Sequence, residues 1–481
     1  MNVVTKSLSA DLGNGMYLNP VLRGNYADPS IVRVGTDYYM THTSYHALPG
    51  LIIWHSKDLI HWSPIGAALH ENVGDVWAPE FIHYQGLFYI YFPANRTNWV
   101  ITASSPEGPW SKPVDLKIKG IDPGHLVTPE GERYLVMSGG ELVRLADDGL
   151  SVIGEPQHVY DGWKYPEDWE VEAYSLEGPK ITYRNGYYYL TVAVGGTAGP
   201  ATGHMVVSSR AVSPFGPWEH SPYNPIVRAA SKKDRWWSKG HGTLVDTPEG
   251  EWWMVYHAYE KGLHTLGRVT MLEPVEWTPD GWFTIQPDIA SHLSIAKPPG
   301  AAGPHGWPTE DGLRGGEIGL HWQCSGHLPQ KRFHPGADGL VGDGRTEGSP
   351  LLYMAGHESY EVQVKVTVQG DAEGRLMLYY NDAHYLGIGA SSKGVRHFRS
   401  FKNYGAMPCP ETPVYLKIRN RENTVSFYFS TDGTAWSKYD KVVEASGLHH
   451  NTLGGFLSLR IGLDAAGEGN VTFTDFVYRP L

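Results

Sequence analysis

The chain has 481 residues and a formal net charge of -12, and its length predicts two domains. Aromatic residues make up 12% of it, and 57 glycines and 34 prolines are present, a composition typical of all-β proteins with many short strands and turns. The acidic balance and the lack of a basic patch argue against nucleic acid or an anionic membrane as a partner.

The number of cysteines and the N-terminal segment indicate in which cellular compartment the protein is expected. Cys324 and Cys409 are too few for a disulfide framework or a zinc site. The opening segment, MNVVTKSLSADLGNG, has no apolar run of the kind that a signal peptide needs. No window approaches the length of a membrane-spanning helix. We therefore expect a cytoplasmic protein that does not associate with membranes.

Strand–turn–strand signals dominate residues 16–297. Five stretches share one order, in which a short turn motif leads into a strand, a polar turn and a second, aromatic strand. They read YADPSIVRVGTDYYM, WAPEFIHYQGLFYIYF, IDPGHLVTPEGERYLVM, LEGPKITYRNGYYYLTV and GHGTLVDTPEGEWWMVY. They recur at intervals of about 40 to 65 residues, which is the period of propeller blades. The pattern predicts a five-bladed β-propeller over residues 16–297.

Each of the five stretches carries one polar residue at the same place. These residues are Asp28, Glu80, Asp122, Glu177 and His241. If each stretch opens the innermost strand of a blade, the five side chains converge on the propeller axis. Four acids and a histidine at one point indicate an active site, which Glu80 would also line.

The residues after the propeller repeats have a different sequence pattern. A segment dense in proline and glycine, KPPGAAGPHGWPTEDGLRGG, starts at Lys297 and predicts a linker over residues 298–316. Beyond it, the alternation in VQVKVTV and VYLKIRN favours an antiparallel β-sandwich over residues 317–481.

Three of the repeated acids match the needs of glycoside hydrolysis. Cleavage of a glycosidic bond needs one protonated and one ionised carboxyl group on either side of the bond. A third carboxylate nearby can keep the acid protonated. An aspartate before proline is ordinarily a turn residue, but acids at equivalent points of successive repeats favour catalysis. We therefore take Asp28, Asp122 and Glu177 as the candidate catalytic residues.

Six motifs, taken in order, resemble glycoside hydrolase family 43. They are YADPSI, VWAPEF, IDPGHL, LEGPKI, KGHGTLV and LGRVTMLEPVEW. This family of five-bladed propellers contains β-xylosidases and α-L-arabinofuranosidases. The resemblance implies an inverting mechanism in which Asp28 is the general base and Glu177 the general acid. Asp122 would then tune the pKa of the acid and orient it.

The resemblance also implies residues that bind the substrate. Arg268 would contact sugar hydroxyls, and Thr197 would line the same site. Tyr45 and Trp77 are candidates for its apolar walls, because the C–H face of a sugar packs well on an aromatic ring. His241 would point into the channel near a cation on the axis, often calcium. Calcium prefers oxygen ligands, so it would be held largely through waters, and a water-filled channel is the alternative. No cofactor is expected to be required.

A loop between the third and fourth repeats is rich in acids that compete with the axial ones. We expect these acids to form a solvated rim, with Glu170 or Glu172 able to approach the pocket. The four acids are Glu167, Asp168, Glu170 and Glu172.

The phrases MLYYNDAHYLGIGAS and FYFSTDGTAWSKYD resemble the lectin-like domain of exo-acting β-xylosidases in the same family. In those relatives a sandwich loop closes one side of the pocket, which admits only a chain end. The expected function is inverting, exo-acting release of a terminal pentose, xylose or arabinose, from plant-derived oligosaccharides. An exo-galactosidase, an endo-acting arabinanase and a non-catalytic carbohydrate-binding scaffold are the alternatives. The expected partner is an oligosaccharide, and a homo-oligomer is left open.

Overall fold

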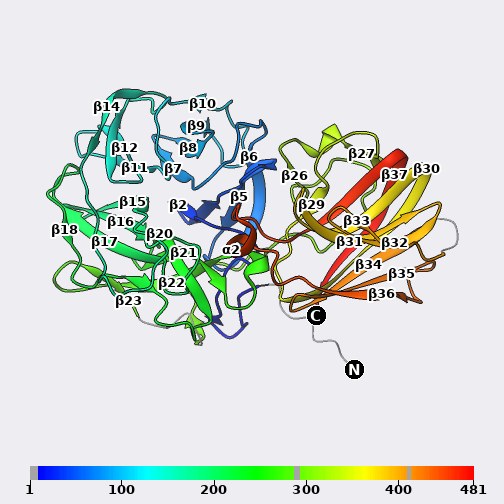
Figure 1. Cartoon of the computed structure of the whole chain (residues 1–481). Helices are drawn as coiled ribbons and strands as arrows, with labels where there is room; N and C mark the ends of the chain where they lie inside the picture. The colour runs from blue at the N-terminus through cyan, green and yellow to red at the C-terminus, as the bar shows by residue number, and fades with distance from the viewer. Residues whose placement is uncertain (1–8, 287–292, 409–412) are drawn as a thin grey trace.

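The computed structural model describes residues 9–286, 293–408 and 413–481, so Cys409 lies outside the described residues. The protein is nearly all β, and a five-bladed propeller and a β-sandwich lie side by side (Figure 1). Both parts of the expected fold class are confirmed. In the described part of the chain, no helix has the length and apolar character needed to cross a membrane.

The five blades are antiparallel sheets in which the first strand is innermost. The first two blades comprise β2 (Ser30–Val34), β3 (Asp37–Thr41), β5 (Gly50–Ser56) and β6 (Ser63–Leu69), then β7 (Glu80–Tyr84), β8 (Leu87–Ala94), β9 (Thr97–Ala103) and β10 (Val114–Asp115). The third comprises β11 (Gly124–Val127), β12 (Arg133–Met137), β13 (Glu141–Leu145) and β14 (Val152–His158).

The fourth blade comprises β15 (Glu177–Arg184), β16 (Tyr187–Val194), β17 (Met205–Ala211) and β18 (Glu219–His220), with β19 (Val227–Arg228) also paired to β17. The fifth comprises β20 (Trp236–Asp246), β21 (Trp252–Glu260), β22 (Arg268–Trp277) and β23 (Phe283–Ile285), and η1 (His264–Leu266) precedes β22. The short strands β1 (Met16–Tyr17) and β24 (Ile295–Ala296) pair with each other and bring the two ends of the propeller together.

The inner strands form a closed ring. β2 packs between β7 and β20, β11 between β7 and β15, and β15 between β11 and β20. The second strand of each blade is covered by sheets on both faces, which explains its nearly continuous aromatic and aliphatic sequence. Seven of the eight residues of β16 are buried, for example. This packing brings the starts of the five inner strands to one end of the axis.

The sandwich is built on two long strands, β30 (Ser359–Asn381) and β37 (Arg460–Pro480), which pair with each other along most of their length. In β30 the predicted alternation appears as buried Val362, Val364 and Val366 between partly exposed residues. The other strands of the sheet are β25 (Glu310–Asp311), β27 (Phe333–Gly336), β28 (Gly339–Asp343), β29 (Leu351–Tyr353), β31 (His384–Ser391), β32 (Gly394–Arg399), β33 (Lys402–Asn403), β34 (Val414–Arg421), β35 (Thr424–Ser430) and β36 (Ser437–Glu444).

Several contacts join the two domains. β4 (Ala47–Leu48) of the propeller pairs with β26 (Cys324–Ser325). Within the sandwich, β25 pairs with β37. Because β25 lies in residues 298–316, the sandwich sheet begins within the segment expected to be a linker. The remaining short elements are η2 (Pro329–Lys331) and α2 (His450–Leu453), and α2 lies at the junction of the domains in Figure 1. The sandwich is therefore in position to contribute to a site on the propeller.

Candidate active site

A pocket with a volume of about 80 Å³ opens at the propeller axis. All eight residues singled out from the sequence as catalytic or substrate-binding lie around it. Its walls are formed by Asp28, Thr43, Tyr45, Trp77, Ala78, Ile121, Asp122, Glu177, Thr197, His241, Arg268 and Phe456. Residues from all five blades and from the sandwich meet here, as expected for side chains placed at the starts of inner strands.

The backbone has positive φ at four of these positions, including Tyr45 with φ of 51°. Asp28 and Asp122 precede their inner strands with φ of 57° and 55°, and His241 has φ of 59° within β20. Residues other than glycine seldom adopt positive φ, although aspartate and histidine do so more readily than most. Such conformations are concentrated at functional sites. The Asp-Pro turn seen in the sequence thus has a second role here, because it lies beside the pocket.

Asp28 is a buried carboxylate surrounded by donors. Thr43 Oγ1 donates to its Oδ2 at 2.5 Å, and Arg268 Nη1 donates to Oδ1 at 3.1 Å. Nδ1 of His257 lies 3.0 Å from Oδ1. Burial alone would raise the pKa of Asp28, but Arg268, followed by His241 and His257, more than offsets it and holds this pKa well below its usual range. Asp28 is therefore ionised at neutral pH.

Glu177 has the opposite electrostatic environment. Burial, followed by the negative charge of Asp122, raises the pKa of its carboxyl to about 8. Its side chain keeps 23% of its surface exposed, more than Asp28 or Asp122 at 7% and 6%. Within the described ranges, its carboxyl has no hydrogen-bond partner in the protein. Glu177 is thus a protonated acid at neutral pH, with its carboxyl free to reach a ligand.

Asp122 is fixed beside Glu177 by three donors. It accepts hydrogen bonds on Oδ2 from the backbone N–H of Gly178 at 3.1 Å and from Ser138 Oγ at 3.4 Å, and His241 Nε2 lies 3.3 Å away. Gly178 has φ of 60°, and a Cβ there would lie 2.7 Å from the ring of His241. Glycine is therefore needed next to Glu177, because the backbone passes directly over the histidine.

The sandwich closes one side of the pocket through Phe456. The guanidinium of Arg268 lies over the Phe456 ring, 5.1 Å from its centroid, and Arg268 Nη2 donates to Tyr45 Oη at 2.6 Å. Asn25 Nδ2 donates to the carbonyl of Phe456 at 3.0 Å. A residue of the second domain thus lies within reach of the pair formed by Arg268 and Asp28.

Two further predicted residues occupy different parts of the pocket. Trp77 is 40% exposed and its Nε1 donates to Asp75 Oδ2 at 2.8 Å, so its ring stands at the mouth. Thr197 is buried and its hydroxyl lies 3.2 Å from Nε2 of His257. Burial lowers the pKa of His257 to about 3, so this histidine is neutral and links Thr197 to Asp28.

Glu80 does not line the pocket, although it occupies the same repeat position as the other acids. Its Oε2 accepts a hydrogen bond from Lys180 Nζ at 2.5 Å and another from Ser30 Oγ, and its Oε1 accepts the backbone N–H of His125. These partners belong to the first, third and fourth blades, so Glu80 joins the inner strands of the propeller to one another.

The acid-rich loop lies at the rim. Glu170 is paired with Lys232 at 3.1 Å, and both side chains are more than half exposed. Glu172 approaches the pocket more closely, because its Oε2 accepts the backbone N–H of Ala198 at 2.7 Å, next to Thr197.

Sequence reasoning missed several residues of the site. His257 lies in the second strand of the fifth blade, where the motif WWMVYHAYE reads as an ordinary aromatic strand. Phe456 lies far away in the sequence, after α2, with no local signal. Ala78 and Ile121 could have been found, because each lies within two residues of a repeated acid.

The histidines on the axis do not form a metal site by themselves. Nδ1 of His241 and both ring nitrogens of His204 are buried without a hydrogen-bond partner, and His204 Nδ1 lies 3.9 Å from Glu177 Oε1. Nevertheless, the described residues include no group of three or more His, Cys, Asp or Glu side chains suited to holding a metal ion. Calcium prefers oxygen ligands, which these imidazoles do not provide. A calcium ion on the axis stays a prediction, and no step below uses one.

Comparisons with known proteins identify the family to which the chain belongs. The sequence profile of glycosyl hydrolases family 43 matches residues 17–283, and that of the beta xylosidase C-terminal Concanavalin A-like domain matches residues 349–479. The chain is 32% identical over 311 residues to a xylan 1,3-beta-xylosidase of Vibrio sp, a match that covers 54% of this chain and 56% of that protein.

Two other similarities extend over nearly the whole chain. It is 30% identical to a non-reducing end alpha-L-arabinofuranosidase of Bacteroides ovatus, with 97% of this chain and 95% of that protein covered. The crystal structure of the GH43 BlXynB protein from Bacillus licheniformis matches with a TM-score of 0.88 at 28% identity, covering 97% of this chain and 100% of that one. With a family profile over more than half of its residues and a relative matched almost end to end, the chain belongs to glycosyl hydrolases family 43.

Proposed function

We propose that this glycoside hydrolase removes a terminal pentose, xylose or arabinose, from the end of an oligosaccharide with inversion at the anomeric carbon. The observation that carries the proposal is the opposite protonation of two carboxyl groups in one pocket. Asp28 is held ionised by Arg268, and Glu177 is held protonated by burial and by Asp122. This is the acid and base pair that glycoside hydrolysis requires.

The roles follow from these states. Asp28 takes a proton from a water molecule while the oxygen of that water forms a bond to the anomeric carbon. The bond from this carbon to the leaving oxygen breaks, and Glu177 gives that oxygen its proton. Asp122 positions Glu177 and keeps it protonated, while Arg268 and Thr197 offer hydrogen bonds to the sugar. No cofactor enters this scheme, and a calcium ion on the axis would have a structural role.

Exo action is supported by the closed side of the pocket. Phe456 of the sandwich and Tyr45 of the propeller both line the pocket, so the sandwich forms part of its wall and limits the room for a polymer chain. Trp77 at the mouth offers an apolar face to a sugar ring. The names of the Vibrio and Bacteroides ovatus relatives refer to a xylosidase and an arabinofuranosidase, which supports a pentose as the released sugar.

A substrate panel tests this function. The purified protein is incubated with aryl β-xyloside, aryl α-L-arabinofuranoside, aryl galactoside and linear arabinan, and the products are separated by chromatography. We expect release from an aryl pentoside and stepwise shortening of a matching oligosaccharide by one sugar. Early formation of mid-sized fragments from arabinan would favour the endo-acting alternative, and no product from any substrate would favour the scaffold.

The first-formed sugar should have inverted anomeric configuration. An inverting pair needs roughly 6.5–9.5 Å between carboxyl groups to admit a water molecule. Asp28 and Glu177 come from the first and fourth blades, whose inner strands are separated in the ring by β20. Proton NMR during the first minutes of hydrolysis, before mutarotation, distinguishes the anomers. A retained anomer would contradict the assignment of Asp28 as a base that acts through water.

The rate should fall on the alkaline side with a midpoint near pH 8. Glu177 must carry a proton to donate it, and its pKa is raised to about 8, so kcat/KM decreases as the pH rises through that value. Asp28 must be ionised, and its lowered pKa places the acidic limb well below the usual aspartate range. Initial rates with an aryl pentoside at constant ionic strength measure both limbs. If kcat/KM were highest at acidic pH and had already fallen to its minimum near pH 7, Glu177 would not be protonated at neutral pH and the assignment would be contradicted.

A further inference from the structure

A second cavity lies between the two domains, on the other side of Tyr45 from the active-site pocket. Its volume is about 50 Å³, and Thr43 and Tyr45 contribute to the walls of both cavities. The propeller supplies Ser44 to its lining, and the sandwich supplies Arg460 at the start of β37. None of the catalytic acids faces it. It therefore calls for an explanation separate from the reaction.

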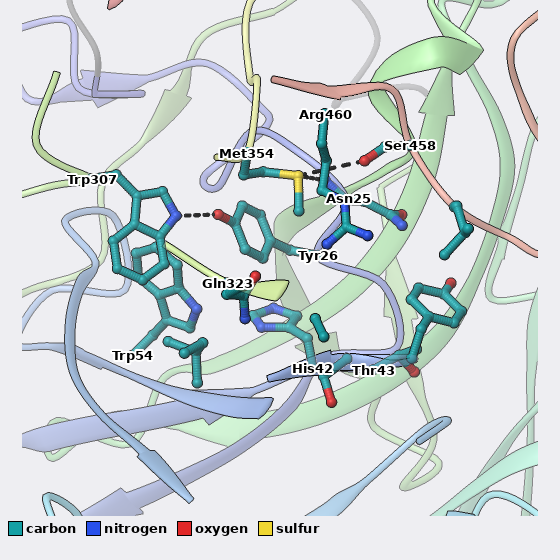
Figure 2. Close-up of a pocket in the computed structure, with 15 residues that line it drawn as sticks. Asn25, Tyr26, His42, Thr43, Trp54, Trp307, Gln323, Met354, Ser458 and Arg460 are labelled. Carbon is teal, nitrogen blue, oxygen red and sulfur yellow. Dashed lines mark hydrogen bonds between the residues drawn. The ribbon is translucent and has the colours of Figure 1, made fainter. Parts of the chain in front are cut away.

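Arg460 is a buried cation without a counter-ion. Its side chain points into the cavity beside Tyr26 and Asn25 (Figure 2), and the residue is only 7% exposed. Across the described parts of the chain, its guanidinium has no hydrogen bond or ion pair with a protein group. Buried charges in proteins are ordinarily paired, because desolvation of an isolated ion is costly. A buried arginine that points into an open space is thus a candidate ligand-binding group.

Most other polar side chains of the cavity already have a protein partner. Asn25 Nδ2 donates to Phe456, Gln323 Nε2 donates to the Pro49 carbonyl at 2.8 Å, the Tyr26 hydroxyl accepts from Trp307 Nε1 at 2.6 Å, and His42 Nε2 lies 3.1 Å from Thr270 Oγ1. The hydroxyl of Ser44 and Nδ1 of His42 are buried without a partner. Arg460 and Ser44 therefore supply two donors without a protein partner, one from each domain, and the hydroxyl of Tyr26, which accepts from Trp307, still has a proton to donate.

We propose that this cavity binds one small monovalent anion, chloride or a planar anion of similar size such as formate or nitrate, between Arg460 and Ser44. The lining contains one cation and no carboxylate, which suits a single negative charge and excludes a metal cation. Trp54, Trp307 and Met354 supply apolar walls, so little water screens the attraction between the ion and the Arg460 guanidinium.

Size decides against larger ligands. By the same measure the cavity has about 50 Å³ and the active-site pocket, which is proposed to hold one pentose, about 80 Å³, so the cavity favours a ligand smaller than a sugar ring or a sugar phosphate. Because Ser44 belongs to the propeller and Arg460 to the sandwich, the ion would connect the two domains directly. It would therefore stabilise their association, and with it the folded protein.

Thermal unfolding of the full chain tests the proposal. The protein is titrated with sodium chloride, formate or nitrate against sodium gluconate at the same ionic strength, gluconate being too large for the cavity. We expect Tm to rise with each small anion, by roughly 2 °C at tenfold excess over Kd, and not with gluconate. Arg460→Met should lose this response while keeping the fold, because its apolar side chain matches Met354 and Trp307. Arg399→Met, at an exposed position of β32, should respond like the original protein.

Two further measurements keep the proposal testable if Arg460→Met fails to fold. Ser44→Ala should weaken the anion response at least several-fold in apparent Kd. In crystals grown with sodium bromide, the anomalous signal should give a peak beside the Arg460 guanidinium. An unchanged chloride response in Arg460→Met, or well-ordered waters with no bromide peak in this cavity, would overturn the proposal. The Tm shifts in the separate titrations with chloride, formate and nitrate show which of these anions binds most tightly.

Discussion

Replacing Asp28 with asparagine should lower kcat by about 10²–10⁴-fold, the usual contribution of a general base. Asparagine has nearly the same shape but keeps only one of the two oxygens, so one of the hydrogen bonds from Thr43 to Oδ2 and from Arg268 Nη1 to Oδ1 is lost. The negative charge that accepts the proton of the attacking water is lost as well. Initial rates with an aryl pentoside measure the loss, and circular dichroism establishes that the variant is folded.

Glu80→Gln is the matched control for this variant. Glu80 occupies the same repeat position, but it is paired with Lys180, both side chains being less than 10% exposed. Breaking a buried ion pair by removing one charge costs about 3–5 kcal/mol, so Glu80→Gln should lower Tm while the folded fraction keeps its kcat. If Asp28→Asn keeps near-normal kcat, or if Glu80→Gln lowers kcat as much without loss of stability, the assignment of Asp28 is wrong.

The propeller could be predicted from the sequence because each blade repeats one local pattern. The turn motif, the polar residue and the aromatic second strand are all short-range features, and the ring places their starts together. This is why Asp28, Asp122 and Glu177, which come from three different blades, line one pocket as expected. Position in the repeat does not fix the role, however. Glu80 lines no part of the pocket because Lys180 lies within reach of it.

The parts that the sequence did not predict depend on contacts between distant segments. Phe456 reaches the pocket because the sandwich packs against the propeller, with β4 paired to β26 and Asn25 donating to the Phe456 carbonyl. His257 can be recognised as a site residue only from its contact with Asp28, which is 229 residues away in the sequence. The cavity of Arg460 likewise exists only when both domains are in place. None of these relations leaves a periodic or local signal in the chain.

Glu177→Gln should have an effect that depends on the leaving group. Glutamine keeps the size of the side chain but has no acidic proton, so the leaving oxygen must depart without protonation. For an alkyl or sugar leaving group we expect kcat to fall by about 10²–10⁴-fold. For an aryl leaving group whose phenol is already acidic, protonation contributes little, and most of the rate should remain. A series of aryl pentosides with phenols of graded pKa, measured beside the matching disaccharide, gives both values.

The same variant should lose the alkaline limb of the pH profile, because the group whose pKa is raised to about 8 is no longer there to titrate. The matched control is Glu172→Gln at the rim. Glu172 is exposed and accepts a hydrogen bond from the backbone of Ala198, so this variant should keep both the alkaline limb and the leaving-group dependence of the original enzyme.

Asp122→Asn gives an independent check. With the neighbouring negative charge removed, the pKa of Glu177 should fall, and the alkaline limb should move to lower pH. If Glu177→Gln slows all leaving groups equally and keeps the limb, Glu177 is not the proton donor, and another group near pH 8 must be sought in the pocket.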